Sequence, residues 1–344
     1  MSRTNCRIGR WEVADCSALT DSCNQFSFAA VKPFSERPPR QLPPRWIDDS
    51  TLAALTAAGT NAHRLCSSSD AWLERFGDDL LLSFKDDAAR DEVLAILPEW
   101  ETGKGLKHRR IFSKFIPVKN DERLAPALID GDSSLPLNTT VSENGMRFGL
   151  DFAAGYSAGL FIDQRANRAS LRHGPVRRLL NTFAYTCSFS VAAALAGAET
   201  VSVDLSKKSL DRGRANFALN SIEPASHRFL ADDVLEVLPR LARRNEKFDA
   251  IILDPPTFSR GNKGRRFQVE HDFETLLQAA LEVAAPRARI LLSTNCTRLT
   301  RRELERIARF ALKLQRGSAE FHSAPDLPDL PRDLGAQTLW LTLK

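Results

Sequence analysis

Phe248-Asp249-Ala250-Ile251-Ile252-Leu253-Asp254-Pro255-Pro256-Thr257-Phe258 is the stretch that decides the fold of this chain. Its first six residues are apolar except for Asp249 and include two isoleucines, which predicts a short buried strand. Pro255 and Pro256 cannot continue that strand, because proline has no backbone N–H and a fixed φ. The stretch therefore predicts a strand ending in the carboxylate of Asp254, followed by a rigid loop that suits a planar base. A simple turn is the alternative.

Strands and helices alternate on both sides of this stretch, from about residue 177 onward. The expected strands are 178–183, 200–204, 248–254, 288–293 and 337–343, and the expected helices are 189–196, 207–219, 273–283 and 301–314. This alternation predicts an α/β fold with a doubly wound, mainly parallel sheet. In such sheets, ligands bind outside the carboxyl ends of the strands, where the strand order reverses.

Polar residues stand at five predicted strand ends, one of which is the end of the segment 228–232. They are Asn181 to Ser188, Asp204, Asp233, Asp254 and Asn295-Cys296. Each acid alone could be only a helix cap, but together they predict one ligand-binding crevice. Asp204 is placed to accept hydrogen bonds from the ribose hydroxyls of a nucleoside cofactor, in a dehydrogenase or in a methyltransferase. An oxidoreductase is disfavoured because no G-x-G-x-x-G follows the first strand.

The N-terminal part of the chain has a different pattern. Residues 1–45 show no sustained periodicity and include a proline-arginine run, which predicts a disordered tail. Residues 46–140 are predicted to form a small α+β domain with RNA binding as one candidate role, and residues 141–344 the larger α/β domain. The elements expected before the larger domain are helices 52–62 and 87–97, a hairpin of 72–76 with 80–84, and a strand 111–118.

Composition limits the class of protein. The chain has 344 residues, 43% apolar and 26% charged, with a formal net charge of +5, which mildly favours a polyanionic partner. Neither a secretory leader nor an apolar run of the roughly 18 residues that a membrane helix needs is found. The six cysteines lack metal-ligand spacing and predict free thiols, a reducing cytoplasmic location and no metal site.

Residues 145–344 resemble the bacterial large-subunit ribosomal RNA methyltransferases of the cytosine-carbon-5 and guanine-N7 types. The matching stretches are Gly159 to Arg165 (the family's T-G-L-F-L-D-Q-R), Asn181 to Ser190, Val203-Asp204, Asp232 to Val234, Asn245 to Asp249, and Asp254 to Phe258. The resemblance implies a Rossmann-like class I methyltransferase fold, S-adenosylmethionine as methyl donor, and large-subunit rRNA as substrate. A non-catalytic RNA-binding protein on the same fold is the alternative.

The resemblance also implies roles for individual residues. It assigns Phe161, Gln164 and Arg165 to the methionine end of the cofactor. It assigns Asp204 to the ribose, Asp233 to the adenine amino group, and Asp254 with Pro255 to the target base. The further cofactor-binding candidates are Asn181, Phe183, Tyr185, Thr186, Leu205 and Val234, and the catalytic candidates are Asp254, Pro255, Pro256 and Cys296.

The first loop departs from the family pattern. Family members usually read L-D-L-F-x-Y-T-G-G-F-S, whereas this chain has Asn181 for the first acid and Cys187-Ser188 for the two glycines. The guanine-N7 branch also carries Asn at the first of these positions. Glycine there lets the backbone approach the ligand or adopt a positive φ. Either the added Cβ atoms narrow the pocket and weaken cofactor binding, or the backbone avoids a positive φ and loses little.

Two target atoms remain open. Cytosine carbon 5 needs a cysteine thiolate to add to carbon 6, and Cys296 matches the place of that nucleophile in the cytosine-type enzymes. Guanine N7 has an exposed lone pair and needs only positioning. Thr257-Phe258-Ser259 and Ser293-Thr294-Asn295 resemble the guanine type. Cys296 is thus a candidate nucleophile or an inert core residue.

Basic residues follow the predicted base slot directly. They are Arg260, Lys263, Arg265 and Arg266, in a segment with two glycines and no acids. The segment predicts a mobile loop that binds RNA phosphates, with a solvated surface loop as the alternative. A second basic stretch over 104–114 and the basic face of helix 301–314 are further candidates, and a charged helix face is most often only solvated.

Overall fold

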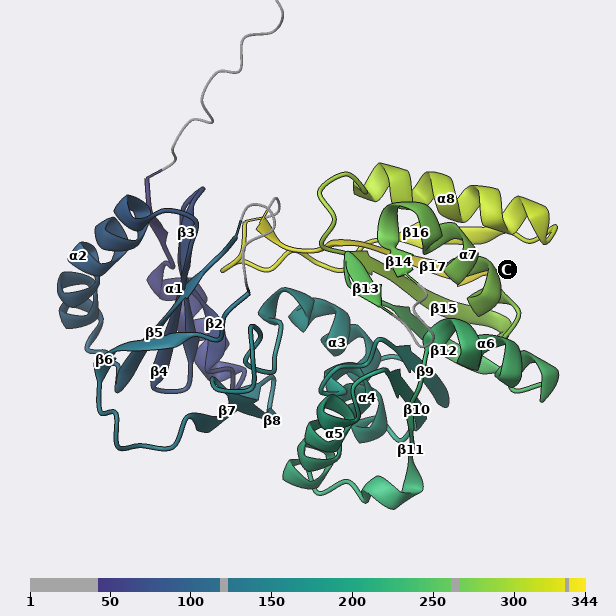
Figure 1. Ribbon diagram of the computed structural model, residues 1–344, viewed down its shortest axis with the longest axis horizontal. Coiled ribbons are helices and arrows are strands. Elements are labelled where there is room, and N and C mark those ends of the chain that lie inside the picture. Colours follow the sequence, from purple (N-terminus) through teal and green to yellow (C-terminus); the bar gives the residue numbers. More distant parts are fainter. Residues whose placement is uncertain (1–42, 118–122, 261–265, 332–333) are drawn as a thin grey trace, which may run out of the picture. The chain divides into compact units, whose positions relative to one another are not determined.

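The computed structural model of the protein describes residues 43–117, 123–260, 266–331 and 334–344 (Figure 1). The predicted tail therefore lies almost wholly outside the described residues. The N-terminal elements are β1 (Arg45–Trp46), α1 (Asp49–Ala57), β2 (Ala62–Ser67), β3 (Ala71–Phe76), β4 (Asp79–Phe84), α2 (Asp87–Lys104), β5 (Arg110–Phe115) and β6 (Ala127–Gly131).

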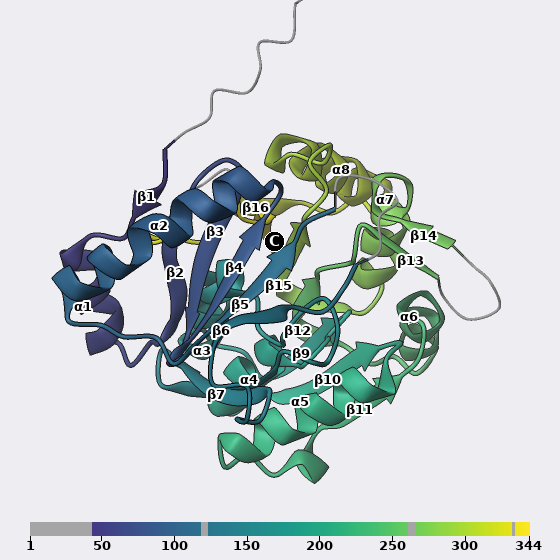
Figure 2. The same ribbon diagram turned by 60° about the vertical axis from the view of Figure 1, so that its left-hand side comes forward.

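These strands form one six-stranded sheet in chain order. The pair β4 and β5 is parallel, with α2 as the crossover between them, and the other neighbours are antiparallel. Helix α2 lies across one face of the sheet (Figure 2). Side chains of α1 and α2, among them Leu55 and Val93, form one core cluster with Leu73 and Leu82 of the sheet. The predicted hairpin is confirmed as β3 and β4.

Helix α1 differs from the prediction, because it ends at Ala57 and not at residue 62. Gly59 has a φ of 65°, which breaks the helical path, and Ala62 already begins β2. The start of α1 is fixed by Asp48, whose carboxylate accepts the backbone N–H of Thr51 at 2.8 Å.

A second set of elements follows. They are β7 (Asn138–Glu143), β8 (Met146–Asp151), η1 (Ile162–Gln164), α3 (Arg165–Arg172), β9 (Arg178–Thr182), α4 (Ser188–Leu195), β10 (Glu199–Asp204), α5 (Lys207–Leu219), η2 (Pro224–Ser226), β11 (Arg228–Ala231), α6 (Val234–Arg243), β12 (Phe248–Leu253), β13 (Phe258–Arg260), β14 (Arg266–Gln268), α7 (Val269–Leu281), β15 (Ala284–Thr294), α8 (Arg301–Leu314), β16 (Ala319–His322) and β17 (Gln337–Leu343). The proposed domain boundary at residue 140 falls inside β7, and the division into domains stays a prediction.

The central sheet has seven strands in the order β11-β10-β9-β12-β15-β17-β16. The five strands from β11 to β15 are parallel, and β17 and β16 add an antiparallel edge. The predicted doubly wound, mainly parallel sheet is therefore confirmed. The chain runs outward from β9 to β11 and then returns to β12, so the strand order reverses between β9 and β12.

Helices cover both faces of this sheet, and the alternation of residues along β12 explains the two layers. Ile251 and Leu253 point into a core with α6, α7 and α8, whereas Ala250 and Ile252 point into a core with α3, α4 and α5. A strand with both faces apolar is typical of a sheet covered on both sides. This is the reason that residues 248–253 form an almost continuous apolar run.

Two short hairpins complete the fold. Strands β7 and β8 pair with each other, and β13 pairs with β14. The predicted mobile loop after the proline pair is thus anchored at both ends, with Arg260 opposite Arg266. Among the described residues no helix is long and apolar enough to cross a membrane.

Candidate active site

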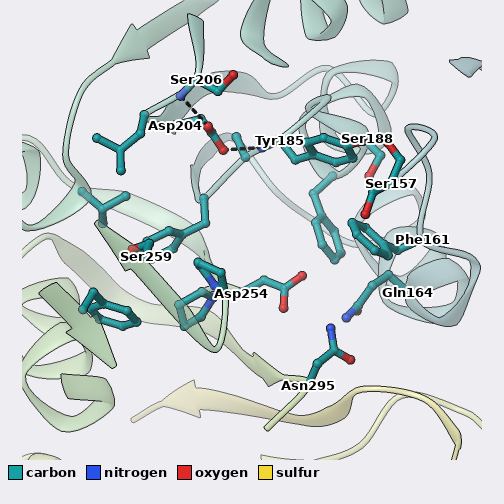
Figure 3. A pocket seen from close by; sticks show the side chains of 18 of the residues that line it. Ser157, Phe161, Gln164, Tyr185, Ser188, Asp204, Ser206, Asp254, Ser259 and Asn295 are labelled. Carbon is teal, nitrogen blue, oxygen red and sulfur yellow. Dashed lines mark hydrogen bonds between the residues drawn. The ribbon is translucent and has the colours of Figure 1, made fainter. Parts of the chain in front are cut away.

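A cavity of about 390 Å³ opens at the carboxyl ends of β9, β10 and β12, where the strand order reverses. Its size falls within the range of small-molecule sites. The predicted residues that line it are Phe161, Gln164, Phe183, Tyr185, Asp204, Leu205, Asp233, Val234, Asp254, Pro255 and Pro256. Figure 3 shows Asp204 and Asp254 on opposite sides of this space.

The loop after β9 forms one wall of the cavity. Tyr185 donates its backbone N–H to Asp204 at 2.8 Å and its hydroxyl to the carbonyl of Ser157 at 2.6 Å. Thr186 donates its hydroxyl to the carbonyl of Gly159 at 2.6 Å. Phe183 and Tyr185 both have a positive φ, a conformation that side-chain-bearing residues rarely adopt. These bonds hold the loop in that shape against the segment before η1.

Asp204 is a half-buried carboxylate at the end of β10. Its two oxygens accept the backbone N–H groups of Tyr185 and Ser206, each at 2.8 Å. Burial raises the pKa of Asp204, and these two hydrogen bonds oppose that rise. No lysine or arginine in the described ranges forms an ion pair with Asp204. Its remaining lone pairs are therefore suited to neutral donors such as hydroxyl groups.

Asp233 has two functions at once in this geometry. Its carboxylate caps α6 by accepting the backbone N–H of Leu235 at 2.9 Å, and it also lines the cavity. The simple interpretation of this acid as a helix cap is thus correct, and the interpretation as a ligand contact is compatible with it.

Asp254 follows β12 and faces the cavity with its carboxylate (Figure 3). Burial raises the pKa of Asp254 to about 6. A hydrogen bond from Ser293 and the positive charge of Arg168 oppose this rise, whereas the negative charge of Asp163 adds to it. The group is thus a carboxylate that changes its charge close to neutral pH, which is typical of functional sites.

Several lining residues were not predicted from the sequence. Asp163 and Arg168 line the cavity beside Gln164. Arg168 lies four residues after Gln164, so the helical spacing of the two could have revealed it. The Arg168 guanidinium is buried and pairs with Glu143, at 2.5 Å. Other unpredicted lining residues are Ser157, Phe189, Ser206, Leu235, Ser259 and Phe267. Ala184, Ser188 and Asn295 also line the cavity, and they belong to strand ends that the sequence placed at the crevice.

Four predicted residues do not belong to the cavity lining. Arg165 forms a buried ion pair with Asp329, and Asn181 donates its side-chain N–H to Ser190 at 2.9 Å. Thr186 belongs to the loop after β9, but its side chain is buried and does not line the cavity. Cys296 lies in the core against α7 and is treated below.

Cys187, which stands where relatives have glycine, takes the positive φ that a glycine would supply. Its φ is 61°, so the expectation that the backbone might avoid this conformation is wrong. The side chain points away from the cavity and packs against Gly213 of α5. A Cβ built on Gly213 would overlap the Cys187 sulfur and lie 3.0 Å from the Cys187 Cβ. The missing side chain at Gly213 therefore makes room for the added one at Cys187.

Gly213→Ala is expected to lower the free energy of unfolding by about 1–3 kcal/mol, because the new methyl group overpacks the site. Cys187→Gly in the same chain should restore most of that loss, because it removes the clashing sulfur. Urea unfolding of the two single variants and the double variant measures this coupling. Additive losses in the double variant would contradict the paired packing.

The basic segments are only partly described. Lys263 and Arg265 lie outside the described residues, and Arg266 is an exposed residue of β14. In the second basic stretch, Arg109 and Arg110 both pair with Asp79. On α8, the ion pairs are Arg306 with Glu303 and Arg309 with Glu305, as on an ordinary solvated helix face. Ser259 of β13 and Phe267 of β14 line the cavity, so this hairpin is a basic segment that reaches the cavity.

No group of three or more histidine, cysteine or acidic side chains with a metal-binding arrangement occurs in the part of the chain that the structure describes. The polar groups that line the cavity are carboxylates, amides, hydroxyls and the guanidinium of Arg168, which is paired with Glu143. Such groups bind an organic ligand through hydrogen bonds.

Comparisons with known proteins identify related chains. The chain is 39% identical over 158 residues to YwbD of Bacillus subtilis strain 168, covering 45% of this chain and 40% of that one. It is 30% identical over 237 residues to the ribosomal RNA large subunit methyltransferase I of Erwinia tasmaniensis, covering 67% and 59%. The chain thus spans between 40% and 59% of the length of these curated relatives.

Solved structures share the fold. SMU.776 complexed with SAH superposes with a TM-score of 0.74 at 26% identity, covering 86% of this chain and 78% of that one. The SAM-dependent methyltransferase from Agrobacterium tumefaciens superposes with a TM-score of 0.65 at 23% identity, covering 83% and 91%. The predicted Rossmann-like methyltransferase fold is confirmed. The sequence model that describes the S-adenosylmethionine-dependent methyltransferase family matches residues 90–342 of this chain. The chain therefore belongs to this family.

Proposed function

We propose that this protein transfers a methyl group from S-adenosylmethionine to a base of large-subunit ribosomal RNA. The observation that carries the proposal is the cavity at the reversal of strand order, with Asp204 on one side and Asp254 on the other. The relative from Erwinia tasmaniensis, named as a ribosomal RNA large subunit methyltransferase, supports the choice of substrate. A cytoplasmic location stays a prediction.

The cavity residues fit a nucleoside cofactor. Asp204 offers carboxylate lone pairs without a cationic partner among the described residues, and these suit the two ribose hydroxyls. Asp233 suits the adenine amino group, and Leu205 and Val234 supply apolar surface for the ring. Phe161 and Gln164 would contact the methionine end. When bound, S-adenosylmethionine supplies an electrophilic methyl group on its sulfonium.

Asp254 and the proline pair suit the target base. The Asp254 carboxylate accepts hydrogen bonds, so it would hold an exocyclic amino or ring N–H group and orient the base. Pro255 and Pro256 keep the carboxylate fixed, because their backbone has little freedom. We expect Arg260, Lys263, Arg265 and Arg266, which follow the proline pair in the sequence, to bind RNA phosphates.

Guanine N7 is the target atom that the position of Cys296 favours. The Cys296 thiol is buried and donates a hydrogen bond to Glu270 at 3.3 Å, while Asn295 faces the cavity in its place. The Cys296 thiol and Arg298 hold the pKa of Glu270 below its usual range, so Glu270 is a carboxylate. Cys296 packs in the core and does not line the cavity, so it has no access to a base bound there. Covalent addition to cytosine is therefore disfavoured, and N7 needs no covalent catalyst.

Cys296→Ser is expected to retain methyl transfer within about threefold of the unmodified protein, since a buried thiol takes no part in the reaction. Cys66→Ser is the matched control, because Cys66 is a buried thiol of β2 in another core. Initial rates with rRNA and labelled S-adenosylmethionine measure both variants. If the rate of methyl transfer falls by about 100-fold or more in Cys296→Ser but not in Cys66→Ser, cytosine carbon 5 is favoured as the target atom.

Mass spectrometry of the rRNA nucleosides from cells with and without the gene tests the proposed function directly. The expected result is one methylated guanosine that disappears from the 23S rRNA when the gene is absent. An unchanged set of modified nucleosides would contradict the proposal.

A further inference from the structure

We propose that Lys114, Arg123 and Tyr156 form a binding site for a phosphate group of the RNA substrate, next to the wall of the cavity. These three residues are called the Tyr156 cluster below. The proposal rests on the proposed function for the choice of RNA as the ligand. It gives β5 of the N-terminal sheet a role in substrate binding.

Strand β5 lies along the segment that leads to the cavity wall. Phe112 and Lys114 are two residues apart in this strand, so their side chains point to the same face of the sheet. The Phe112 ring stacks on Phe152, with the ring centroids 4.0 Å apart and an interplanar angle of 10°. The Lys114 ammonium lies over the Tyr156 ring, 4.8 Å from its centroid. One face of β5 therefore holds two rings of the same segment.

A second cation approaches the Tyr156 ring. The Arg123 guanidinium lies 5.5 Å from the ring centroid, and at this distance the face of an aromatic ring attracts a cation. Tyr156 is the only ring in the described part of the chain that contacts two different cations in this way. Two positive charges near one ring repel each other. A bound anion would relieve this repulsion.

Neither cation is neutralised by another side chain. Lys114 and Arg123 form no ion pair and no hydrogen bond with any of the residues that the structure describes. Burial lowers the pKa of Lys114, the charge of Glu74 opposes this decrease, and the charge of Arg64 adds to it. The Glu74 carboxylate is already paired with Arg64 at 3.2 Å. The Tyr156 cluster thus carries positive charge that the described residues leave uncompensated.

The structure separates Lys114 from the rest of the basic stretch over 104–114. Four basic residues of this stretch have an acidic partner, and they are Lys104, His108, Arg109 and Arg110. Lys107 and Lys114 have none among the described residues, and Lys107 is exposed. Lys114 is half-buried and packs on a ring. The fold therefore holds Lys114 in place without neutralising its charge.

The Tyr156 cluster adjoins the cavity wall. Ser157 follows Tyr156 directly and lines the cavity (Figure 3). The Ser157 carbonyl accepts the hydroxyl of Tyr185 at 2.6 Å, which ties this segment to the loop after β9. Consecutive Cα atoms are about 3.8 Å apart. The cluster can therefore reach the backbone of an RNA strand whose base enters the cavity.

The cavity itself is unsuited to a phosphate group. Four of its lining residues are acids, and they are Asp163, Asp204, Asp233 and Asp254. Arg168, the one cationic lining residue in the described ranges, is paired with Glu143. Negative charge at this site repels phosphate, so the RNA backbone needs positive charge outside the cavity. Lys114 and Arg123 supply it without lining the cavity.

The test is equilibrium binding of deproteinised 23S rRNA, from cells without the gene, to the full chain at several potassium chloride concentrations. Lys114→Met removes the charge but keeps an unbranched side chain, and it should weaken binding about five- to tenfold at about 0.1 M salt. The slope of log affinity against log salt should become shallower by about 0.7–0.9, as for one lost phosphate contact. Arg123→Met should have the same two effects.

Lys107→Met is the matched control, because it removes an unpaired lysine of the same basic stretch outside the Tyr156 cluster. Its affinity and slope should equal those of the unmodified protein, and Lys114→Arg, which keeps the charge, should restore both. Arg123 is exposed, so Arg123→Met remains a valid test if Lys114→Met does not fold. Unchanged affinity and slope in the folded variants, or an equal loss in Lys107→Met, overturns the site.

A purely structural role of Lys114 predicts a different result. Lost packing would lower kcat and the affinity for S-adenosylmethionine, whereas a lost phosphate contact should raise the KM for rRNA and leave kcat and that affinity unchanged. The binding measurement itself needs no methyl transfer. Weaker rRNA binding by the variants of a protein that does not methylate rRNA would contradict only the proposed function. Normal methylation with unchanged rRNA binding in the variants would contradict only the Tyr156 cluster.

Discussion

Asp204→Ala is expected to weaken S-adenosylmethionine binding by about 100-fold, because it removes the two charge-assisted hydrogen bonds that we propose Asp204 forms with the ribose. The carboxylate also anchors the cavity wall through the backbone of Tyr185 and Ser206, so the loop loses support at the same time. Isothermal titration calorimetry with S-adenosylmethionine measures the change.

Asp211→Ala is the matched control for this prediction. Asp211 is an acid of α5 whose charge is paired with Lys207 and Arg214 outside the cavity, and its loss should leave the affinity unchanged. Equal affinity of Asp204→Ala and the unmodified protein would contradict the ribose assignment. Absence of binding in the unmodified protein would favour the non-catalytic RNA-binding alternative.

Asp254→Ala is expected to slow methyl transfer by about 1000-fold, with the affinity for S-adenosylmethionine changed much less. In the proposed function the Asp254 carboxylate orients the target base, so its loss should affect the reacting geometry more than the binding of the cofactor. Single-turnover rates on rRNA, combined with calorimetry, separate the two effects. An equal loss of cofactor affinity would indicate that Asp254 contacts the cofactor and not the target base.

The pH dependence follows from the raised pKa of Asp254, about 6. Only the ionised carboxylate accepts the hydrogen bonds of the base. The rate of methyl transfer should therefore be highest above this pKa and should fall as the pH drops through it. In Asp254→Asn the residual rate should not change between pH 5 and pH 7 for this reason. A persistent acid limb in that variant would assign the titration to another group.

The local sequence pattern was sufficient to predict the central sheet and the strand ends whose residues line the cavity. Apolar runs such as 248–253 fold as strands wherever both faces are covered, and an acid before two prolines must end its strand. Parallel strands bring their carboxyl ends together, so Asp204, Asp233 and Asp254 were placed in one crevice from the sequence alone.

Side chains that depend on distant partners were not predictable in this way. Arg165 belongs to the same short motif as Gln164, but Asp329, which pairs with it, lies far along the chain. The motif alone gives no means of deciding which of the two faces the cavity. Cys296 likewise depends on Glu270, which reaches it from α7.

The sequence by itself determined the family, the fold and the acids of the site, because these follow from periodicity and from short motifs. Only the tertiary structure decided that Cys187 fits its loop because Gly213 has no side chain, and that Asn167 joins Trp340 to Gln164 through two hydrogen bonds. Packing and hydrogen-bond direction are set between residues far apart in the chain. The local sequence pattern therefore does not predict which of these distant residues come into contact.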